Sequence, residues 1–219
     1  MTKAIVLGGT GLVGSQLLEA LAADARFDAV VAVVRRPTQQ RSPKIEDRVI
    51  DFSSADAFRG VVQGDVLFSA LGTTLKKAGS KDAQYEVDYT FQMRAAVAAR
   101  ANGVDAYVLV SSMGADASSS LFYSRMKGEL DRDVMALGFP KCRICRPGIL
   151  DGDRAESRPM EKLGLGAMRG LRFVPGLKKY RPIHARTVAA AMIAASFLPD
   201  PGSVVLEAEE LFRLGGAAL

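Results

Sequence analysis

Short apolar runs alternate with helix-length segments along most of the chain. The runs are nearly all apolar, as is typical of strands that are covered on both faces. We expect strands at Ala4–Leu7, Ala29–Val34, Val49–Ile50, Val66–Ala70, Tyr107–Val110, Arg143–Cys145 and Val204–Leu206. The third run, Val49–Ile50, is the shortest and is the weakest indication of a strand.

The segments between these runs carry apolar residues at helical spacing. In Leu12–Leu21, for example, Val13, Leu17 and Leu21 share one helical face. Further helices are expected at Asp82–Ala101, Ser119–Leu137, Met160–Leu171 and Arg186–Leu198. Strands that alternate with helices predict an α/β fold, a doubly wound and mostly parallel Rossmann-like sheet with helices on both faces. No linker divides the chain, so we expect residues 1–219 to form a single domain, with 151–182 as a small excursion on the substrate side.

A glycine-rich turn follows the first predicted strand and opens the first predicted helix. It reads Gly8-Gly9-Thr10-Gly11-Leu12-Val13-Gly14. Gly8 permits a tight turn, Gly11 lets the backbone approach a pyrophosphate, and Gly14 lets the helix pack close to the strand. The free N–H groups at a helix start favour phosphate. The turn therefore predicts a dinucleotide site, the alternative being a purely structural connection.

The end of the second predicted strand indicates which dinucleotide is bound. A site for NAD has Asp or Glu there, bonding the ribose 2′-hydroxyl. This chain has Arg35 and Arg36 instead, and two guanidiniums suit the 2′-phosphate of NADP(H). Two solvated surface arginines are the alternative. Asp51 and Phe52 follow the third run, where a carboxylate could meet the adenine amino group.

A candidate catalytic group lies further along the chain. Tyr123 and Lys127 are four residues apart in a predicted helix and so share a face. Ser111 and Ser112 end the preceding strand, where ligands bind in open α/β sheets. A phenol is a poor base near neutral pH, but a neighbouring ammonium and an oxidised nicotinamide favour the phenolate. These residues predict acid–base chemistry at Tyr123, with ordinary helix packing as the alternative.

Together these motifs resemble those of the short-chain dehydrogenases/reductases, and more narrowly the atypical members related to the Tat-interacting-protein oxidoreductases. The similarity rests on the glycine turn, Leu71-Gly72-Thr73-Thr74, Ser111-Ser112-Met113-Gly114-Ala115-Asp116, Tyr123 through Glu129, and Arg146-Pro147-Gly148. It runs through most of the chain and is weakest after about residue 185.

The resemblance implies NADP(H) binding and assigns three catalytic positions, Ser112, Tyr123 and Lys127. It also implies contacts along the cofactor by Leu71, Gly72, Thr73, Ser111, Lys127, Pro147 and Gly148. Two departures stand out. Ser111 stays an alternative to Ser112, because both serines precede Tyr123 at a suitable interval. Many members carry Asn in the helix after the fourth strand, where this chain has Asp88.

Composition narrows the classes of function. Hydrophobic residues make up 48% and charged residues 24%, and the net charge is +5. This small excess of positive charge favours an anionic ligand, whereas binding of nucleic acid would require a more concentrated basic patch. We expect no signal peptide and no membrane span. Cys142 and Cys145 should be inert thiols on opposite faces of a strand, which fits a cytoplasmic protein. The lone His184 is expected to make a helix-entry or a loop contact and to lie outside any zinc site.

We therefore expect an NADP(H)-dependent oxidoreductase that acts on a small carbonyl or alcohol. Two alternatives are a dehydratase or isomerase that uses the nucleotide transiently, and an NADP(H)-binding regulatory protein without turnover. The large substrate domain of sugar-nucleotide epimerases is missing. Residues 162–181 carry six Lys or Arg and no Asp or Glu, and Lys76, Lys77 and Lys81 follow the fourth strand. These cations predict either a basic lid over an anionic substrate or a solvated helix face, and the oligomeric state is left open.

Overall fold

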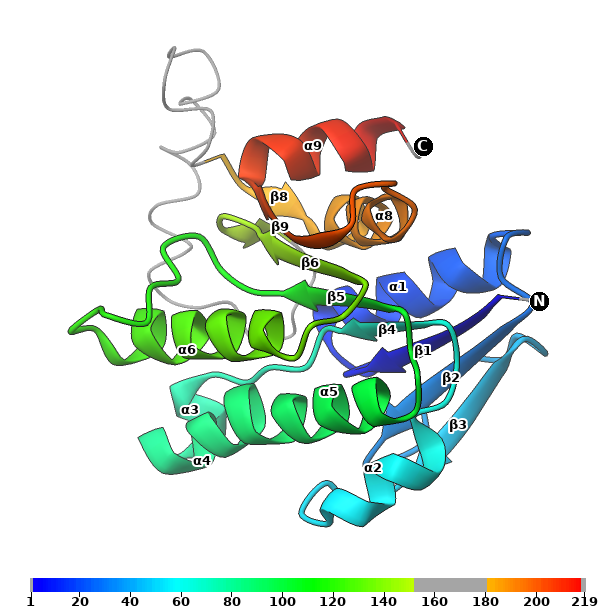
Figure 1. Ribbon diagram of the computed structural model, residues 1–219, viewed down its shortest axis with the longest axis horizontal. Helices are drawn as coiled ribbons and strands as arrows, with labels where there is room; N and C mark the ends of the chain where they lie inside the picture. The colour runs from blue at the N-terminus through cyan, green and yellow to red at the C-terminus, as the bar shows by residue number, and fades with distance from the viewer. Residues whose placement is uncertain (1, 152–180, 218–219) are drawn as a thin grey trace.

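The computed structural model describes residues 2–151 and 181–217. In this part of the chain, seven parallel strands form one sheet in the order β3-β2-β1-β4-β5-β6-β9 (Figure 1). They are β1 (Lys3–Leu7), β2 (Ala29–Val34), β3 (Ile45–Val49), β4 (Val66–Ser69), β5 (Ala106–Val110), β6 (Lys141–Arg146) and β9 (Gly202–Glu207). The predicted Rossmann-like sheet is confirmed. The strand order reverses between β1 and β4, and in open α/β sheets ligands bind at that point, beyond the carboxyl ends of the strands.

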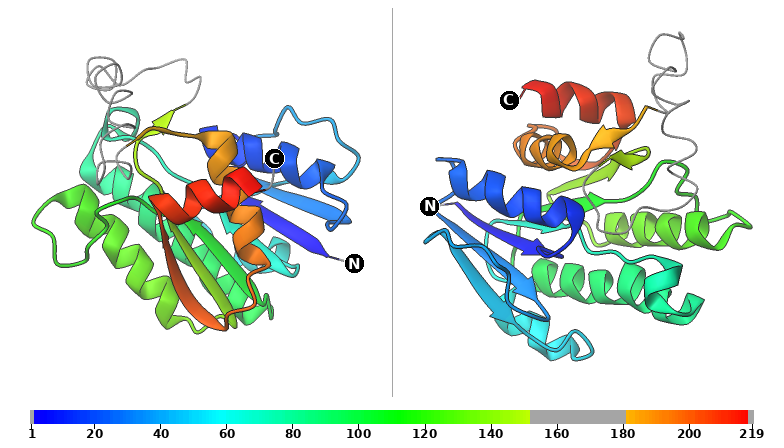
Figure 2. Two further views of the ribbon diagram at one scale, coloured as in Figure 1. Left: turned by 90° about the horizontal axis from the view of Figure 1, so that it is seen from above. Right: turned by 180° about the vertical axis from the view of Figure 1, so that it is seen from behind.

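Helices cover both faces of the sheet, as the views from above and behind also show (Figure 2). One face carries α1 (Leu12–Ala23), α8 (Ala185–Ser196) and α9 (Ala208–Ala217). The other carries α2 (Ala55–Val61), α5 (Phe91–Ala101) and α6 (Phe122–Ala136). The short helices α3 (Leu75–Ala78) and α4 (Lys81–Tyr85) follow β4, and a π-helical turn, η1 (Glu86–Thr90), joins α4 to α5. The helix expected at Asp82–Ala101 thus exists, with a π turn inside it.

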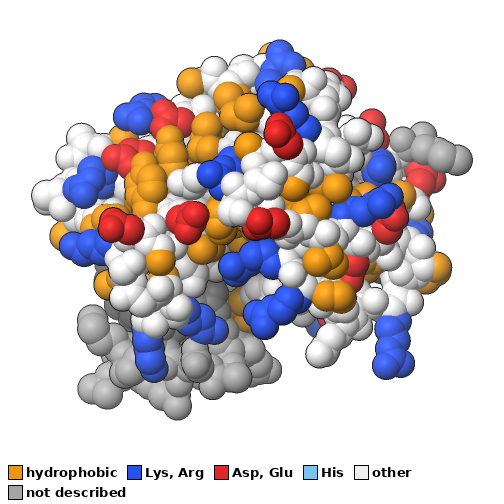
Figure 3. Space-filling view, turned by 90° about the horizontal axis from the view of Figure 1, so that it is seen from below, with side chains coloured by type: hydrophobic (Ala, Val, Ile, Leu, Met, Phe, Trp, Pro, Cys, Tyr) orange, Lys and Arg blue, Asp and Glu red, His pale blue; other side chains and the backbone are white. Residues whose placement is uncertain are grey.

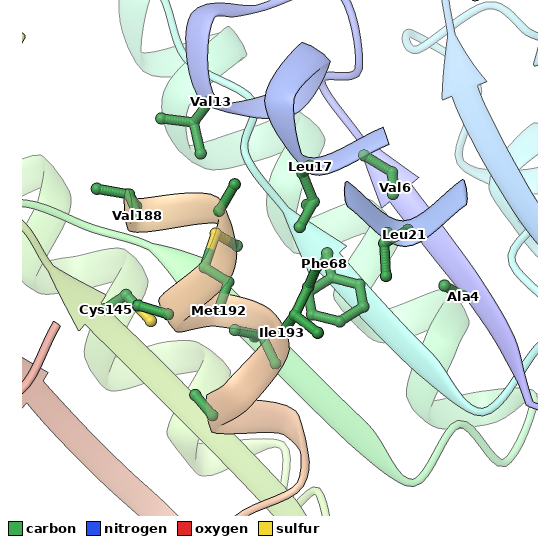
Figure 4. Packing of buried hydrophobic residues seen from close by; sticks show 14 of the residues in the cluster. Ala4, Val6, Val13, Leu17, Leu21, Phe68, Cys145, Val188, Met192 and Ile193 are labelled. Atoms are coloured by element: carbon green, nitrogen blue, oxygen red, sulfur yellow. The ribbon is translucent and has the colours of Figure 1, made fainter. Parts of the chain in front are cut away.

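Alternate residues of each central strand enter two separate cores. Ala4 and Val6 of β1 pack with α1 and α8, whereas Ile5 and Leu7 pack on the side of α2 and α5. Figure 4 shows the first core, with side chains of α1 and α8 meeting over the sheet. Burial on both faces explains why these strands read as unbroken apolar runs.

The third strand was predicted at the wrong residues. The expected Val49–Ile50 contributes only its first residue, since β3 is Ile45–Val49. This strand lies at the edge of the sheet and has the sequence Ile-Glu-Asp-Arg-Val, with three of its five residues exposed. A search for apolar runs misses such a strand, because an edge strand does not need two buried faces.

The two cysteines lie on opposite faces of β6, as predicted. Both are free and buried, with Cys142 in one core and Cys145 in the other. Burial raises the pKa of the Cys142 thiol to about 11 and that of the Cys145 thiol to about 12. The pair is therefore part of the hydrophobic core.

The helix expected at Met160–Leu171 and most of the 151–182 excursion lie outside the described residues. Two short strands that flank the excursion form a small parallel pair, β7 (Leu150–Asp151) with β8 (Ile183–His184). His184 is the residue that enters α8, as expected, and its side chain is exposed. None of the described helices is both long and apolar enough to cross a bilayer. The described side chains also contain no group of three His, Cys, Asp or Glu suited to a metal ion.

Candidate functional site

The glycine turn connects β1 to α1 through very close backbone contacts. Gly8 has φ +87°, and a Cβ added to it would lie 2.6 Å from the backbone nitrogen of Leu71. A Cβ on Gly14 would lie 2.1 Å from the carbonyl oxygen of Gly8. Both positions therefore require glycine, Gly8 for its conformation and both for space. The contact also brings the loop after β4 directly beside the turn.

The start of α1 offers unpaired donors at this turn. Gly11 is the N-cap residue with an extended backbone (φ −83°, ψ 173°), and no side chain caps the helix. The first turn contains no acidic residue. Thr10 and Gly11 are exposed, so the helix start faces solvent. Uncapped N–H groups and the positive end of the helix dipole make this a site for an anion such as a phosphate.

The loop after β4 is held by a buried aspartate. Thr73 N–H donates to Asp88 Oδ2 at 2.8 Å, and a Cβ on Gly72 would lie 3.2 Å from Asp88 Oδ1. Asp88 is 3% exposed and lies in the π turn η1. The side chain of Gln92, one turn further on, donates to the Asp88 carbonyl at 2.6 Å. Asp88 thus fixes the backbone at Thr73 and packs against Gly72, two of the predicted cofactor residues.

The two arginines follow β2 in a loop pinned to β3. Thr38 donates to Asp47 from its backbone N–H at 2.6 Å and from its hydroxyl at 2.9 Å. Arg35 and Arg36 are exposed, and neither forms an ion pair with a described carboxylate. Arg35 lies with its guanidinium carbon 5.9 Å from the centre of the Phe52 ring. Two free guanidiniums therefore stand at the carboxyl edge of the sheet, beside the glycine turn.

Asp51 and Phe52 differ in accessibility. Asp51 is exposed and accepts hydrogen bonds from Ser53 N–H (2.9 Å) and Oγ–H (2.6 Å), which lower the pKa of its carboxyl. The Phe52 ring is buried against Phe58 and Phe91, with ring centres 5.2 and 5.7 Å away. Only Asp51 can present its side chain to an adenine. The Phe52 ring instead lies under the guanidinium of Arg35.

Tyr123 and Lys127 lie on consecutive turns of α6, as predicted. Tyr123 is 42% exposed, whereas Lys127 is 3% exposed and donates from Nζ to the Val110 carbonyl at 3.3 Å. The β5–α6 loop packs closely on this helix, since a Cβ on Gly128 would lie 2.2 Å from the backbone nitrogen of Ala117. The lysine therefore reaches the carboxyl end of β5, where the predicted serines follow.

The two candidate serines have different surroundings. Ser111 is 5% exposed, and its hydroxyl faces the buried carboxyl of Asp131. Ser112 is half-buried, and its hydroxyl donates weakly to the Met113 carbonyl at 3.3 Å. Met113 N–H in turn donates to the Pro147 carbonyl at 2.9 Å. The segment that ends β5 therefore runs beside Pro147 and Gly148 after β6, and only Ser112 has an accessible hydroxyl.

A buried ion pair beneath Lys127 is absent from the sequence predictions. Asp131 is 1% exposed, and Arg146 Nη2 lies 3.0 Å from its Oδ2. Burial raises the pKa of the Asp131 carboxyl, while the Ser111 hydroxyl, Lys127 and Arg146 lower it. The sequence could have indicated Asp131, because it follows Lys127 by four positions and so shares its helical face. Arg146, by contrast, meets Asp131 only through tertiary packing.

The start of α4 lies beside the start of α6. Lys81 Nζ is 5.6 Å from the centre of the Phe122 ring, which places a cation next to the turn that carries Tyr123. Lys76 of α3 and Leu121, the N-cap residue of α6, are exposed. The face of the molecule seen from below, which includes α5 and α6, mixes Lys and Arg with Asp, Glu and hydrophobic side chains (Figure 3). The basic segment 162–181 lies outside the described residues except for Arg181.

Known proteins share both the sequence and the fold. A family model described as NAD(P)H-binding matches residues 8–138, more than half of the chain. "Protein FMP52, mitochondrial" of Meyerozyma guilliermondii is 43% identical, with 95% of this chain and 93% of the relative covered. "Protein FMP52-1, mitochondrial" of Scheffersomyces stipitis is 38% identical, with 97% and 98% covered. A solved short chain dehydrogenase from Burkholderia cenocepacia in complex with NADP has a TM-score of 0.68 at 20% identity, covers 99% of this chain and 92% of its own, and shares the fold.

The names of these relatives correct one prediction. Both FMP52 proteins are named as mitochondrial, which contradicts the cytoplasmic location predicted from the sequence. The prediction was wrong because reduced, buried thiols and an ordinary composition do not distinguish one reducing compartment from another.

Proposed function

This chain belongs to the NAD(P)H-binding family, and from that premise we propose that it is an NADP(H)-dependent oxidoreductase. Its reaction is hydride transfer between the nicotinamide and a small carbonyl or alcohol substrate. The observation that carries the proposal is Lys127, a buried cation at the carboxyl end of β5, one turn from the exposed Tyr123. The narrower kinship with the Tat-interacting-protein oxidoreductases is part of the same proposal.

The residues of the glycine turn fit a dinucleotide. Its backbone packs too closely for side chains at Gly8 and Gly14, and the start of α1 is uncapped and exposed. A pyrophosphate would be held by the residues Gly8, Thr10, Gly11, Leu12, Val13 and Gly14. Leu71, Gly72 and Thr73 would lie along the cofactor from the other side of the switch point, with Pro147 and Gly148 near the nicotinamide.

The arginines favour NADP(H) over NAD(H). Arg35 and Arg36 are exposed, have no described carboxylate partner, and occupy the place where NAD-binding sites carry an acidic residue. Guanidiniums bind phosphate through charge-assisted hydrogen bonds. Asp51 would accept a hydrogen bond from the adenine amino group.

Three side chains perform the proton chemistry. When bound, the cofactor supplies or accepts the hydride. The Tyr123 hydroxyl donates its proton to the substrate oxygen during reduction and takes it back during oxidation. The Lys127 ammonium lies one turn further along the same helical face, at the carboxyl end of β5. The Ser112 hydroxyl donates a hydrogen bond to the substrate oxygen as negative charge develops there.

The substrate is small and carries a negative charge. Lys81 stands over Phe122 beside the turn of Tyr123, and the exposed Lys76 lies in the preceding helix. Cations at the mouth of a site raise the local concentration of anions. The exposed Leu121 offers apolar surface at the same mouth.

A panel of small carbonyl acids and alcohols, followed by NADPH absorbance, tests the proposal. We expect Tyr123→Phe to lower turnover by about 10²- to 10⁴-fold, since it removes only the proton donor, and to leave NADPH affinity unchanged. Tyr85→Phe is the matched control, because it removes a hydroxyl that bonds Glu129 of α6 outside the site. If Tyr123→Phe keeps the wild-type rate, the mechanism is wrong. NADPH binding without turnover of any member of the panel would favour a regulatory protein.

A further inference from the structure

The loop that carries Arg35 and Arg36 crosses from β2 to β3 without a helix. Residues 35–44 connect these two parallel strands, and none of them is helical. Parallel strands are usually connected through a helix, which packs on the sheet and holds the chain that leaves the strand. Because this crossover has no helix, other contacts must hold the two arginines at the end of β2.

Two anchors lie on either side of the arginines. Before them, the carbonyl of Val34 at the end of β2 accepts a hydrogen bond from Ile50 N–H at 3.0 Å. After them, Thr38 donates to Asp47 of β3 twice, from its N–H to Oδ2 at 2.6 Å and from its hydroxyl to Oδ1 at 2.9 Å. Pro37 lies between the arginines and Thr38, and a proline restricts its own backbone and that of the residue before it. The arginines therefore stand on a short stretch of chain whose two ends are fixed.

The second anchor also places the loop beside the glycine turn. Asp47 is half-buried and lies on the same face of β3 as Ile45, which packs against the core that contains α1. A Cβ added to Gly9 would lie 3.7 Å from Thr38 Cγ2, so Thr38 lies next to the turn. Both Asp47 oxygens accept from Thr38, and no ion pair of the described structure joins Asp47 to an arginine. The carboxylate thus holds the loop and does not neutralise the guanidiniums.

Resting on the proposed preference of the site for NADP(H), we propose that Asp47 is a positioning residue for recognition of the 2′-phosphate. Its carboxylate holds Thr38 and thereby keeps the two preceding arginines at the carboxyl edge of the sheet, where the ribose of a dinucleotide lies. A guanidinium binds phosphate through hydrogen bonds of fixed geometry. A loop that is already held loses less conformational freedom when the phosphate binds. Asp47 therefore determines the choice between NADPH and NADH without touching the phosphate.

The ratio of the dissociation constants for NADH and NADPH tests this inference, measured by fluorescence titration of the whole chain. We expect Asp47→Ala to lower the preference for NADPH by about five- to tenfold and to change NADH affinity by less than about twofold, because only the phosphate contacts require the held loop. Thr38→Val removes the hydroxyl bond and keeps the N–H bond, so it should lower the preference by about two- to threefold. An effect of charge alone has the opposite sign, since removing a carboxylate near a phosphate raises the preference.

Asp65→Ala is the matched control. The Asp65 carboxylate also accepts a backbone N–H at 2.6 Å, from Lys3, but at the amino ends of β1 and β4, the edge of the sheet away from the glycine turn. This variant should leave the ratio unchanged even where it lowers stability. Asp47→Ala should likewise leave the ratio unchanged in an Arg35→Ala/Arg36→Ala background, because the loop then has no guanidinium to position.

The outcomes separate this inference from the function on which it rests. Equal affinities of the wild type for NADPH and NADH refute the NADP(H) assignment and the inference together. A wild-type preference that Asp47→Ala leaves intact or raises overturns the inference alone, and so does an equal loss of affinity for both dinucleotides, which indicates a merely structural role. Should Asp47→Ala fail to fold, Thr38→Val decides: a lowered ratio supports the role of Asp47, and an unchanged ratio overturns it.

Discussion

The region around β1, α1 and β2, which we call the cofactor half, differs from the region between β5, α6 and β6, which we call the catalytic half. The difference lies in whether backbone or side chains form the site. Around β1, α1 and β2 the site is made of backbone, with glycines that permit close contacts and an uncapped helix start. Among the described residues, no buried polar or charged side chain precedes Ser69. Between β5, α6 and β6, by contrast, Ser111, Lys127 and Asp131 are all buried, and Arg146 reaches in from the rim.

This difference predicts which substitutions each half can tolerate. Backbone donors bind phosphates, which are the same in every dinucleotide, so this half needs space and no particular side-chain chemistry. Buried side chains set charge and proton transfer, and each of them depends on its partners. The cofactor half should therefore respond to added volume, and the catalytic half to the loss of single polar atoms.

The largest effect is expected from added volume at the glycine turn. Gly11→Val should weaken NADPH binding by about 10²- to 10⁴-fold, because the pyrophosphate would lose two charge-assisted hydrogen bonds, about 3–6 kcal/mol. Gly11 is the right position, since its backbone is extended and the nearest atom to an added Cβ is the Gly8 oxygen at 3.2 Å. Isothermal titration calorimetry measures the loss.

Gly60→Val is the control for Gly11→Val. It also lies in the first third of the chain, and an added Cβ there would meet nothing within 4 Å. Both variants should stay folded by circular dichroism. Unchanged NADPH affinity in a folded Gly11→Val protein would mean that the nucleotide binds elsewhere. The claim that backbone space forms the cofactor half of the site would then be wrong.

The next effect concerns a single polar atom in the catalytic half. Ser112→Ala should lower kcat by about 10²- to 10³-fold, as the loss of one hydrogen-bond donor to a developing oxyanion does. Ser111→Ala should cost less than about tenfold, because its hydroxyl is buried and faces Asp131. Steady-state kinetics on one substrate distinguishes the two serines. The opposite ranking would assign catalysis to Ser111.

The same contrast decides how much could be predicted from the sequence. The glycine turn and α1 were predictable because their constraints are local: Gly8, Gly11 and Gly14 act within one turn of chain. The helical spacing of Tyr123 and Lys127 was predictable for the same reason. The strand β3 was misplaced because an edge strand lacks an apolar signature.

Long-range pairs could not be predicted. Asp131 and Arg146 meet only when α6 packs on β6, and Thr38 meets Asp47 only when β2 and β3 pair. Phe52 was predicted beside the cofactor from its position after a strand, but its ring lies in the core. Sequence position predicted which edge of the sheet a residue reaches, and tertiary packing determined where its side chain points.

A smaller effect is expected for cofactor choice. NADPH should bind more tightly than NADH by roughly 1.5–3 kcal/mol, about 10- to 150-fold, if a guanidinium pairs with the 2′-phosphate. Arg35→Ala/Arg36→Ala should remove this preference and leave NADH affinity unchanged. Arg48→Ala is the control, since that exposed arginine of β3 pairs with Glu46. Equal affinities of the wild type for NADPH and NADH, measured by fluorescence titration, would refute the assignment.

The smallest effect is expected from the thiols of β6, which lie in the catalytic half but behave as core. Cys142 and Cys145 should not react with Ellman's reagent at pH 8 in the folded protein, and both should react in denaturant. Their folded-state pKa values of about 11 and about 12 exceed the unfolded value of about 8.5, so the folded state keeps protons that the unfolded state loses. Their contribution to stability is therefore complete below about pH 8.5 and declines as the pH rises toward 11. Replacing Cys145 by Ala should flatten this decline in a urea titration across that range. Rapid reaction of the native protein would instead mean that the thiols are accessible, and the assignment of both cysteines to the core would be wrong.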